Sequence, residues 1–209
     1  MRLSKTLPED IEEIIASGDL GAVARAVEGC QIGAYLRRSA YEPRLMHFPA
    51  SQEITAFLLE RGEDINSRDR YEQTPVHWRV MNRRVDQIPY LVSRGADINA
   101  RDRDDRTPLF DAVRILEASD VERMISWGAN ALEVIRVLLA HGAPTGKRER
   151  ESLRSMDSLR CAFITHGHSG VPDSLFDEAV AALAQLCALF GVEQREAVPA
   201  PVLGERLVF

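Results

Sequence analysis

The feature that most constrains the fold of this chain is a polar stretch that occurs twice. Residues 62–78, GEDINSRDRYEQTPVHW, return as GADINARDRDDRTPLFD at residues 95–111. Glycine, aspartate, asparagine and a Thr-Pro pair recur at matched positions, each 33 residues apart, as Gly62 and Gly95 are. A fixed internal period of this length predicts an array of similar units, each of which packs against the next.

One unit, residues 74–102, shows the physical chemistry of the array. Thr74 is a good N-terminal cap and Pro75 has no backbone N–H to leave unsatisfied, so the pair predicts a helix start. Gly95 predicts the end of a second helix, because glycine adopts the left-handed conformation without strain. The apolar stripe expected on that second helix is Val85, Ile88, Leu91 and Val92.

The recurring residues are those of ankyrin repeats, a family that this chain resembles clearly over residues 45–144 and more weakly over 9–192. The resemblance implies an all-α solenoid of four to five helix-turn-helix units. Within a single domain of residues 1–209, the expected units are a capping repeat at 9–40, repeats at 41–73, 74–106 and 107–145, a degenerate repeat or cap at 146–192, and an extended tail at 193–209.

Three parts of the chain depart from a regular array. The repeat at 41–73 lacks about three residues between its helices, judged against the 33-residue period. The unit that begins at Thr107 contains a surplus segment at 116–129, which looks helical and should project from the edge opposite the turns. Helices at 150–164 and 173–192 form a divergent C-terminal pair, as a terminal unit must differ to avoid an open apolar face. The buried face expected on the second of these helices is Leu175, Val180, Leu183, Leu186, Cys187 and Phe190.

Composition narrows the class of protein. The net charge of −6 argues against general affinity for nucleic acid, which normally needs a basic domain. Cys30, Cys161 and Cys187 are widely spaced and form no CxxC pair, which predicts reduced thiols. The N-terminus is acidic where a signal peptide is apolar, and no apolar run is long enough to span a membrane. We therefore expect a cytoplasmic protein that binds neither nucleic acid nor membrane.

Catalytic and metal-binding motifs are weak. HGHSG at residues 166–170 differs from the G-x-S-x-G nucleophile motif and follows a predicted helix, so an interhelical loop is the favoured interpretation. Cys161, His166 and His168 lack a fourth ligand at zinc spacing. The resemblance implies that His77 forms a hydrogen bond within its own turn, and His47 could do the same. We expect no metal, no cofactor and no enzymatic activity; a hydrolase that uses HGHSG stays the alternative.

The resemblance implies that a partner binds to the concave face, formed by the turn tips and the exposed sides of the first helices. The candidate residues on this face are rich in tryptophan, tyrosine and arginine, the residue types that dominate binding hot spots. Trp78 could instead fold inward over Arg79 and make no contact with a partner. Arg79 is itself unusual, because the family prefers a small residue at that position. The candidate contacts are Arg68, Arg70, Tyr71, Glu72, Gln73, Trp78, Met81, Asn82, Arg101, Arg103, Asp104, Asp105, Arg106, Asp111, Arg114 and Ile115, with Phe48 from the preceding unit.

Two positions in the turns are unusual. Glu72 and Asp105 stand where the family commonly has a glycine in a left-handed backbone conformation. Aspartate tolerates that conformation better than glutamate does, so we expect the turn at Glu72 to be distorted. These tips are the first candidates for specific recognition.

The expected function is a protein-protein interaction module that is a monomer when free and binds one protein partner. Within that class we favour an inhibitor or immunity-type protein that neutralises a partner enzyme or toxin. A scaffold with several partners is a further, weaker alternative.

Overall fold

The computed structural model describes residues 3–117, 132–166 and 173–196. The chain divides into two compact units, Met1–Ala112 with Glu133–Pro144, and Val113–Leu132 with Thr145–Phe209. Each unit is described by itself below. The single-domain boundaries expected from the sequence stay a prediction.

The first unit begins with a mixed cap of strands and helices. The elements are β1 (Ser4–Thr6), α1 (Ile11–Ala16), α2 (Leu20–Val27) and β2 (Cys30–Tyr35). The two strands are parallel, and α1 and α2 form the crossover that parallel pairing requires. The capping repeat therefore contains two paired strands, whereas the sequence analysis expected it to be wholly helical. On α2, Val23 and Val27 are buried, whereas Leu20 is only half-buried.

The next repeat has lost most of its first helix. A single 3-10 turn, η1 (Leu45–His47), stands in its place, and α3 (Gln52–Glu60) is its second helix. Ser51 caps α3 by accepting the N–H of Ile54 at 3.2 Å. The three residues that the sequence lacks are thus missing from the first helix of the repeat.

Arg79 compensates for that lost helical turn. Its guanidinium group is buried and donates to the carbonyl oxygens of His47 at 2.6 Å, Phe48 at 2.8 Å and Met46 at 3.3 Å. These carbonyls have lost the helical partners that a longer helix would supply. Burial, with Arg84 nearby, lowers the pKa of Arg79 to about 10. The residue that looked odd in the sequence therefore completes the packing of the shortened repeat.

Two further repeats follow. The first comprises α4 (Pro75–Met81), η2 (Val85–Gln87) and α5 (Ile88–Ser93), and the second begins with α6 (Pro108–Glu117) and ends with a helix at 132–140. Gly62, Gly95 and Gly142 end their helices with positive φ values of 100°, 95° and 88°. Ile88 and Leu91 are buried, and the other two members of the predicted stripe are half-buried.

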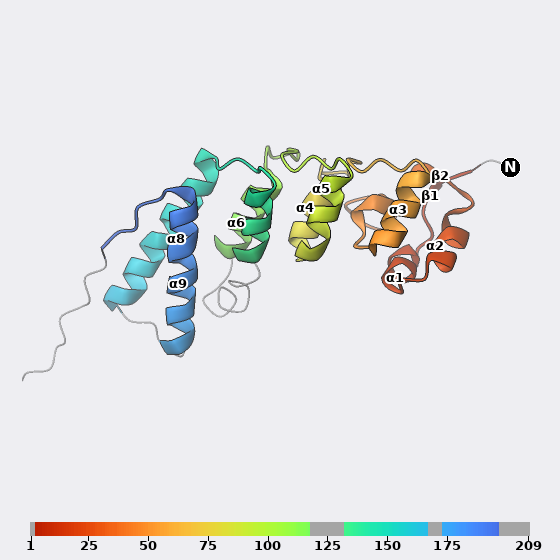
Figure 1. Cartoon of the computed structure of the whole chain (residues 1–209). Coiled ribbons are helices and arrows are strands. Elements are labelled where there is room, and N and C mark those ends of the chain that lie inside the picture. Colours follow the sequence, from red (N-terminus) through yellow and green to blue (C-terminus); the bar gives the residue numbers. More distant parts are fainter. Residues whose placement is uncertain (1–2, 118–131, 167–172, 197–209) are drawn as a thin grey trace, which may run out of the picture. The chain divides into compact units, whose positions relative to one another are not determined.

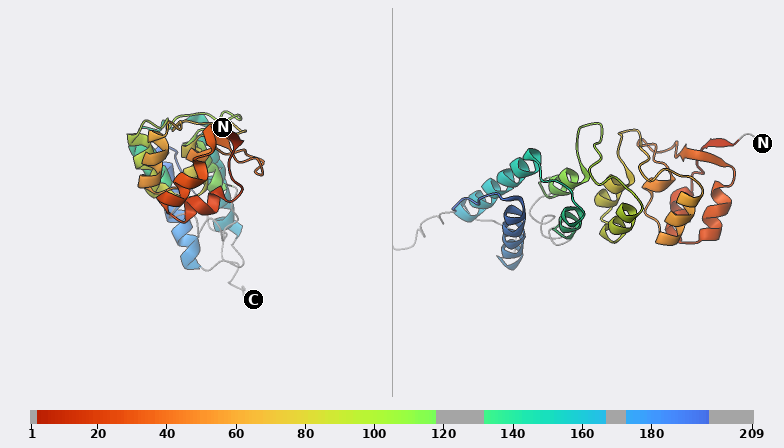
Figure 2. Two further views of the ribbon diagram at one scale, coloured as in Figure 1. Left: turned by 90° about the vertical axis from the view of Figure 1, so that its right-hand side faces the viewer. Right: turned by 45° about the horizontal axis from the view of Figure 1, so that its top comes forward.

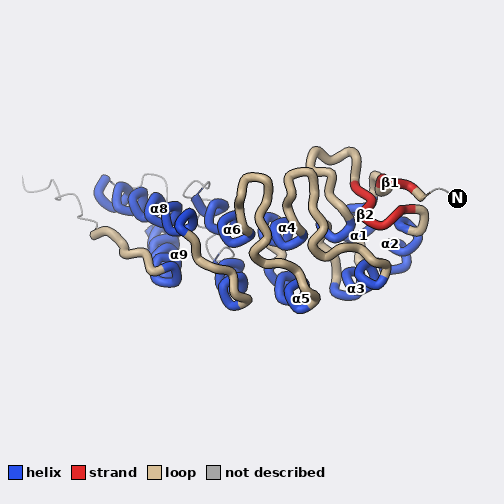
Figure 3. The backbone as a smooth tube through the Cα atoms, turned by 90° about the horizontal axis from the view of Figure 1, so that it is seen from above, coloured by secondary structure: helices blue, strands red, loops and turns tan. Residues whose placement is uncertain are grey.

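Figures 1 and 2 show that helices α1 to α5 of the first unit stand side by side, with long loops along one edge. Figure 3 shows the loops before α4 and α6 lying next to each other along that edge. Because each loop belongs to one repeat, side chains 30 or more positions apart in sequence become neighbours there.

The second unit contains the two predicted C-terminal helices, α8 (Lys147–His166) and α9 (Asp173–Phe190), which pack against each other. The face predicted for α9 is largely confirmed: Leu183, Leu186, Cys187 and Phe190 are buried and Val180 is half-buried, while the side chain of Leu175 is not among those described. Residues 193–196 form no helix or strand. Most of the predicted insertion at 116–129 and of the tail lies outside the described residues.

Candidate functional site

Three turn tips of the first unit share one backbone hydrogen bond and one left-handed residue. We define tip 1 as residues 39–44, tip 2 as 69–74 and tip 3 as 102–107. The fourth residue of each tip is an acid in the left-handed conformation: Glu42 at φ 49°, Glu72 at φ 61° and Asp105 at φ 59°. Each donates its N–H to the carbonyl three residues earlier, at 3.1, 3.1 and 3.0 Å. The expected distortion at Glu72 is therefore wrong, because the turn's hydrogen bonds hold glutamate and aspartate in the same geometry.

The sequence analysis missed tip 1 as a member of this series. Its Tyr-Glu pair lies 30 residues before that of tip 2, at Tyr41 and Tyr71, and not 33. A signal was present, since each pair is followed at the same offset by a histidine, His47 or His77. The fixed 33-residue period concealed it.

A buried aspartate organises tips 2 and 3. In tip 2, Asp69 Oδ1 accepts the N–H groups of Tyr71 and Gln73 at 2.8 and 2.9 Å. In tip 3, Asp102 Oδ1 accepts those of Asp104 and Arg106, both at 2.9 Å. Side-chain bonds of this kind satisfy turn N–H groups that no helix or sheet pairs. The backbone of each exposed tip is therefore fixed from beneath.

The second oxygen of each aspartate has a different partner. Asp69 Oδ2 accepts the indole N–H of Trp78 at 2.9 Å. Asp102 Oδ2 accepts the guanidinium group of Arg106, whose Nε lies at 2.9 Å. Burial by itself would raise the pKa of Asp102, but hydrogen bonds from the backbone and side chain of Arg106 outweigh it, so the pKa is lowered.

Two buried histidines connect each repeat to the next tip. His77 Nδ1 accepts the backbone N–H of Thr74 at 3.1 Å, and its Nε2 therefore carries the proton and donates to the carbonyl of Arg106 at 3.1 Å. His47 likewise accepts the N–H of Arg44 and donates to the carbonyl of Gln73 at 2.9 Å. The structural roles predicted for both histidines are confirmed. Burial lowers the pKa of His47 to about 4 and lowers that of His77.

Aromatic rings gather between tips 1 and 2. The ring centroids of Tyr41 and Tyr71 are 5.0 Å apart, and Trp78 meets Tyr41 edge-on at 5.9 Å. Trp78 also makes edge contacts with His47 and Phe48, at 5.5 and 6.3 Å. The tyrosines remain exposed, at 46% for Tyr41 and 38% for Tyr71, whereas Trp78 is half-buried. The cluster thus has a fixed base and two accessible rings.

Arginine side chains and backbone bonds join the tips into one row. The N–H groups of Arg70 and Arg103 donate to the carbonyls of Tyr41 and Tyr71, at 2.8 and 2.9 Å. The guanidinium of Arg103 lies 5.3 Å from the centre of the Tyr71 ring and donates to the carbonyl of Arg70. Arg68 bridges tips 2 and 3, since it donates to the carbonyls of Glu72 at 2.8 Å and Arg101 at 2.7 Å.

The other predicted contacts separate into exposed and buried residues. On tip 3, Asp105 pairs with Arg101 at 2.7 Å and Asp104 pairs with Arg106 at 2.8 Å. Asp111 is 2% exposed and its Oδ1 lies 3.8 Å from Arg106 Nε, so its prediction as a surface contact is wrong. The reason is that this position of α6 faces the base of the tip. Gln73 is also buried.

The remaining predicted residues lie on the helices. Met81 is half-buried, and its sulfur lies 3.9 Å from the amide nitrogen of Gln73. Asn82 is exposed at the end of α4, where its side chain donates to the carbonyl of Trp78. Arg114 is exposed and belongs to the second unit, and the side chain of Ile115 is not among those described.

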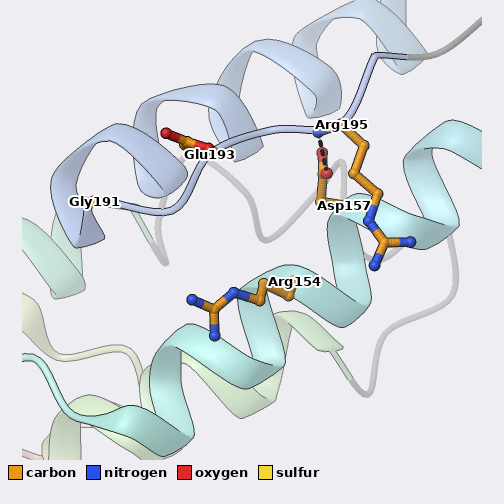
Figure 4. Close-up of a pocket in the computed structure, with 5 residues that line it drawn as sticks. All are labelled: Arg154, Asp157, Gly191, Glu193 and Arg195. Carbon is orange, nitrogen blue, oxygen red and sulfur yellow. Dashed lines mark hydrogen bonds between the residues drawn. The ribbon is translucent and has the colours of Figure 1, made fainter.

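The second unit has a small polar hollow of about 370 Å³, shown in Figure 4. Arg154 and Asp157 of α8 line it, together with Gly191, Glu193 and Arg195 from the segment after α9. Asp157 is buried and accepts the backbone N–H of Arg195 at 2.8 Å, which fixes that segment against α8. The exposed lining carries both charge signs, so it favours no class of ligand.

The described residues also bear on three other kinds of feature: a metal site, a membrane-spanning helix and a hydrolase site. Within residues 3–117, 132–166 and 173–196, no group of three or more His, Cys, Asp or Glu side chains is placed to hold a metal ion. In the same part of the chain, no helix is long and apolar enough to cross a membrane. Of HGHSG, only His166 lies in a described helix, so the hydrolase alternative stays a prediction.

Comparison with protein-family models identifies the family. A family model described as ankyrin repeats, in three copies, matches residues 45–149. This span contains α3 to α6, the helix at 132–140, and tips 2 and 3. A search of curated proteins found no matching relative.

Proposed function

The chain belongs to the ankyrin-repeat family, whose members act as protein-protein interaction modules, and from this premise we propose that it binds one protein partner through its tips. The proposed centre of contact, here called the tip surface, consists of Tyr41, Arg70, Tyr71, Trp78 and Arg103. Around it we include the accessible members of the predicted set, with Glu42 added: Glu42, Arg68, Glu72, Met81, Asn82, Arg101, Asp104 and Asp105.

The observation that carries this proposal is the pair of exposed tyrosine rings, 5.0 Å apart, on two turns that buried aspartate and histidine side chains stabilise. Aromatic side chains held in place lose little conformational entropy on binding, which makes them efficient contacts. Trp78 also supports this surface from beneath, because its indole N–H donates to Asp69, the first residue of tip 2.

The finer proposal is that binding blocks the partner, as in an inhibitor or immunity-type protein of the cytoplasm. A preformed surface needs only to cover a functional region of the partner, and no chemistry from this chain is required. A stoichiometric complex in which the partner loses its activity is the expected result.

Affinity capture from the native lysate tests the proposal. The wild-type chain is compared with Tyr41→Ala/Tyr71→Ala and with Tyr90→Ala, a matched loss of a tyrosine on α5, outside the tips. We expect wild type and Tyr90→Ala to retain the same partner, and the double variant to lose about tenfold or more in affinity for the purified partner. Equal affinity of all three chains, with equal thermal stability, would reject the tip surface as the contact.

A further inference from the structure

Resting on the proposed function, we propose that the partner presents an acidic, extended polypeptide segment to tips 1 and 2 and to Arg103 of tip 3. Its carboxylates lie against Arg70 and Arg103, and an aromatic or apolar side chain between them lies on the rings of Tyr41 and Tyr71. This commits the surface to a partner of stated charge and chemistry.

The local charge is opposite to that of the chain. The whole chain has a net charge of −6. The two stretches that carry these tyrosines, residues 37–42 and 68–72, contain four exposed arginines against two exposed glutamate side chains and the buried Asp69, and Arg103 adds a fifth arginine beside Tyr71. Arg37 and Arg38, which precede tip 1, form no ion pair with any residue that the structure describes. The arginines are Arg37, Arg38, Arg68, Arg70 and Arg103. Such a basic patch on an acidic protein favours an acidic ligand by steering and by contact.

Two of the arginines are suited to accept a carboxylate. Arg103 is already held over Tyr71 and against the carbonyl of Arg70, so little entropy is lost when a ligand binds to its remaining N–H groups. Arg70 has a side chain that is 58% exposed, and its nearest carboxylate, in Glu42, lies at 4.0 Å. An exposed pair at that distance is weak, and a partner's carboxylate can replace it.

Tip 3 sets the direction of the segment. The side chains of Asp104 and Asp105 are 63% and 69% exposed; Asp104 is paired with Arg106 of tip 3 and Asp105 with Arg101, the residue just before that tip. These pairs leave tip 3 no excess positive charge for a second acidic stretch. The acidic part of the partner therefore lies over tips 1 and 2 and ends at Arg103, and a neutral or basic part follows over the rest of tip 3.

A polypeptide fits this surface better than a single-stranded nucleic acid does, although arginine and tyrosine serve both. A nucleic acid carries a phosphate at every nucleotide and cannot omit one. Glu42, Glu72 and Asp105 recur along the row of tips, so regularly spaced phosphates would approach them. A polypeptide can place single carboxylates beside the arginines and neutral residues beside the acids.

The test uses a random-sequence peptide library displayed on phage. Selection on the full wild-type chain is followed by depletion on Tyr41→Ala/Tyr71→Ala, so that only tip-dependent peptides remain. Selected peptides are synthesised and their affinities measured by calorimetry against wild type, Arg70→Gln/Arg103→Gln, and the control Arg25→Gln/Arg94→Gln, which removes two exposed arginines outside the tips. A single-stranded DNA oligonucleotide is used as competitor, and circular dichroism verifies the fold of each variant.

We expect the selected peptides to be enriched in Asp and Glu next to an aromatic residue, to bind more weakly as salt increases, and to lose about tenfold in affinity in Arg70→Gln/Arg103→Gln only. Tip-dependent peptides without acidic enrichment would overturn this inference but leave the proposed function standing. Absence of tip-dependent peptides would count against both. Preferential binding of the oligonucleotide at the same arginines would overturn the choice of a polypeptide.

Discussion

Tips 2 and 3 have the same backbone hydrogen bonds but different side chains beneath them, and the difference decides which groups each tip exposes. In tip 2 the second oxygen of Asp69 accepts an indole N–H from Trp78, a residue of the following helix. In tip 3 the second oxygen of Asp102 accepts a guanidinium from Arg106, a residue of the tip itself. Both solutions satisfy a buried carboxylate, so the turn geometry survives the exchange.

Two positions differ between the units of tip 2 and tip 3, the last residue before the threonine and the fourth residue after it. Arg106 corresponds to Gln73 and Asp111 corresponds to Trp78, each 33 residues on. Where the partner of the aspartate is an indole, its ring extends an aromatic cluster toward solvent. Where it is a guanidinium, the neighbouring carboxylates of Asp104 and Asp111 gather around it. Tip 2 therefore offers apolar contact area, and tip 3 uses most of its charge internally.

Removal of the central aspartates should produce the largest effect. Asp69→Ala leaves two backbone N–H groups and an indole N–H without their acceptor, and we expect a loss of about 3 to 4 kcal/mol in unfolding free energy. Asp102→Ala should cost less, about 2 kcal/mol, because Arg106 is 19% exposed and keeps Asp104. Chemical denaturation measures both, with the exposed Asp86→Ala as control. A larger loss for Asp102→Ala would contradict the comparison.

Acidification should weaken the connection between η1 and tip 2. Burial lowers the pKa of His47 from 6.5 to about 4 in the folded chain, so the unfolded chain takes up the proton first as the pH falls. Stability is complete above pH 6.5 and declines toward pH 4, by up to about 3 kcal/mol in total. Protonation also removes the acceptor Nδ1 from the N–H of Arg44.

Denaturation curves between those pH values measure this decline. His47→Asn should start from a lower stability at neutral pH and show a flatter dependence on pH. An unchanged slope in that variant would mean that other groups cause the acid sensitivity.

Replacement of the left-handed acids by glycine should produce the smallest effect, of opposite sign. Glu72 is held at φ 61°, a conformation that costs a non-glycine residue about 1 kcal/mol, and Glu72→Gly should raise stability by roughly 0.5 kcal/mol after the entropy of glycine is deducted. Asp105→Gly should give no gain, since aspartate tolerates the conformation and its ion pair with Arg101 is lost. Thermal unfolding distinguishes the two; equal gains would show that the acids differ little in strain.

Features that depend on one residue and its immediate neighbours were predictable from the sequence. The Thr-Pro helix start and the glycine helix ends at Gly62, Gly95 and Gly142 follow from local backbone chemistry, whereas the histidine bond to its own turn was implied by the family resemblance. The family match over residues 45–149 agrees with the repeat pattern, because the residues that start and end the helices recur in each repeat.

Features that depend on which side chains meet between neighbouring repeats were not predictable from the sequence. Tip 1 escaped detection because η1 shortened its unit, and Arg79 was unexplained because its three acceptors belong to the preceding repeat. Asp111 was assigned to the surface because a helix position alone does not specify its neighbour, and that neighbour is Arg106.

The sequence by itself determined an array of helical repeats joined by polar turns, since backbone conformation is encoded locally and repeated. Only the tertiary structure decided that Tyr41 and Tyr71 meet, that Trp78 supports one tip while Arg106 supports the next, and that three acids share the left-handed position. The physical reason is that burial and hydrogen-bond partners at the tips come from adjacent repeats, so each tip's surface is a property of the stack.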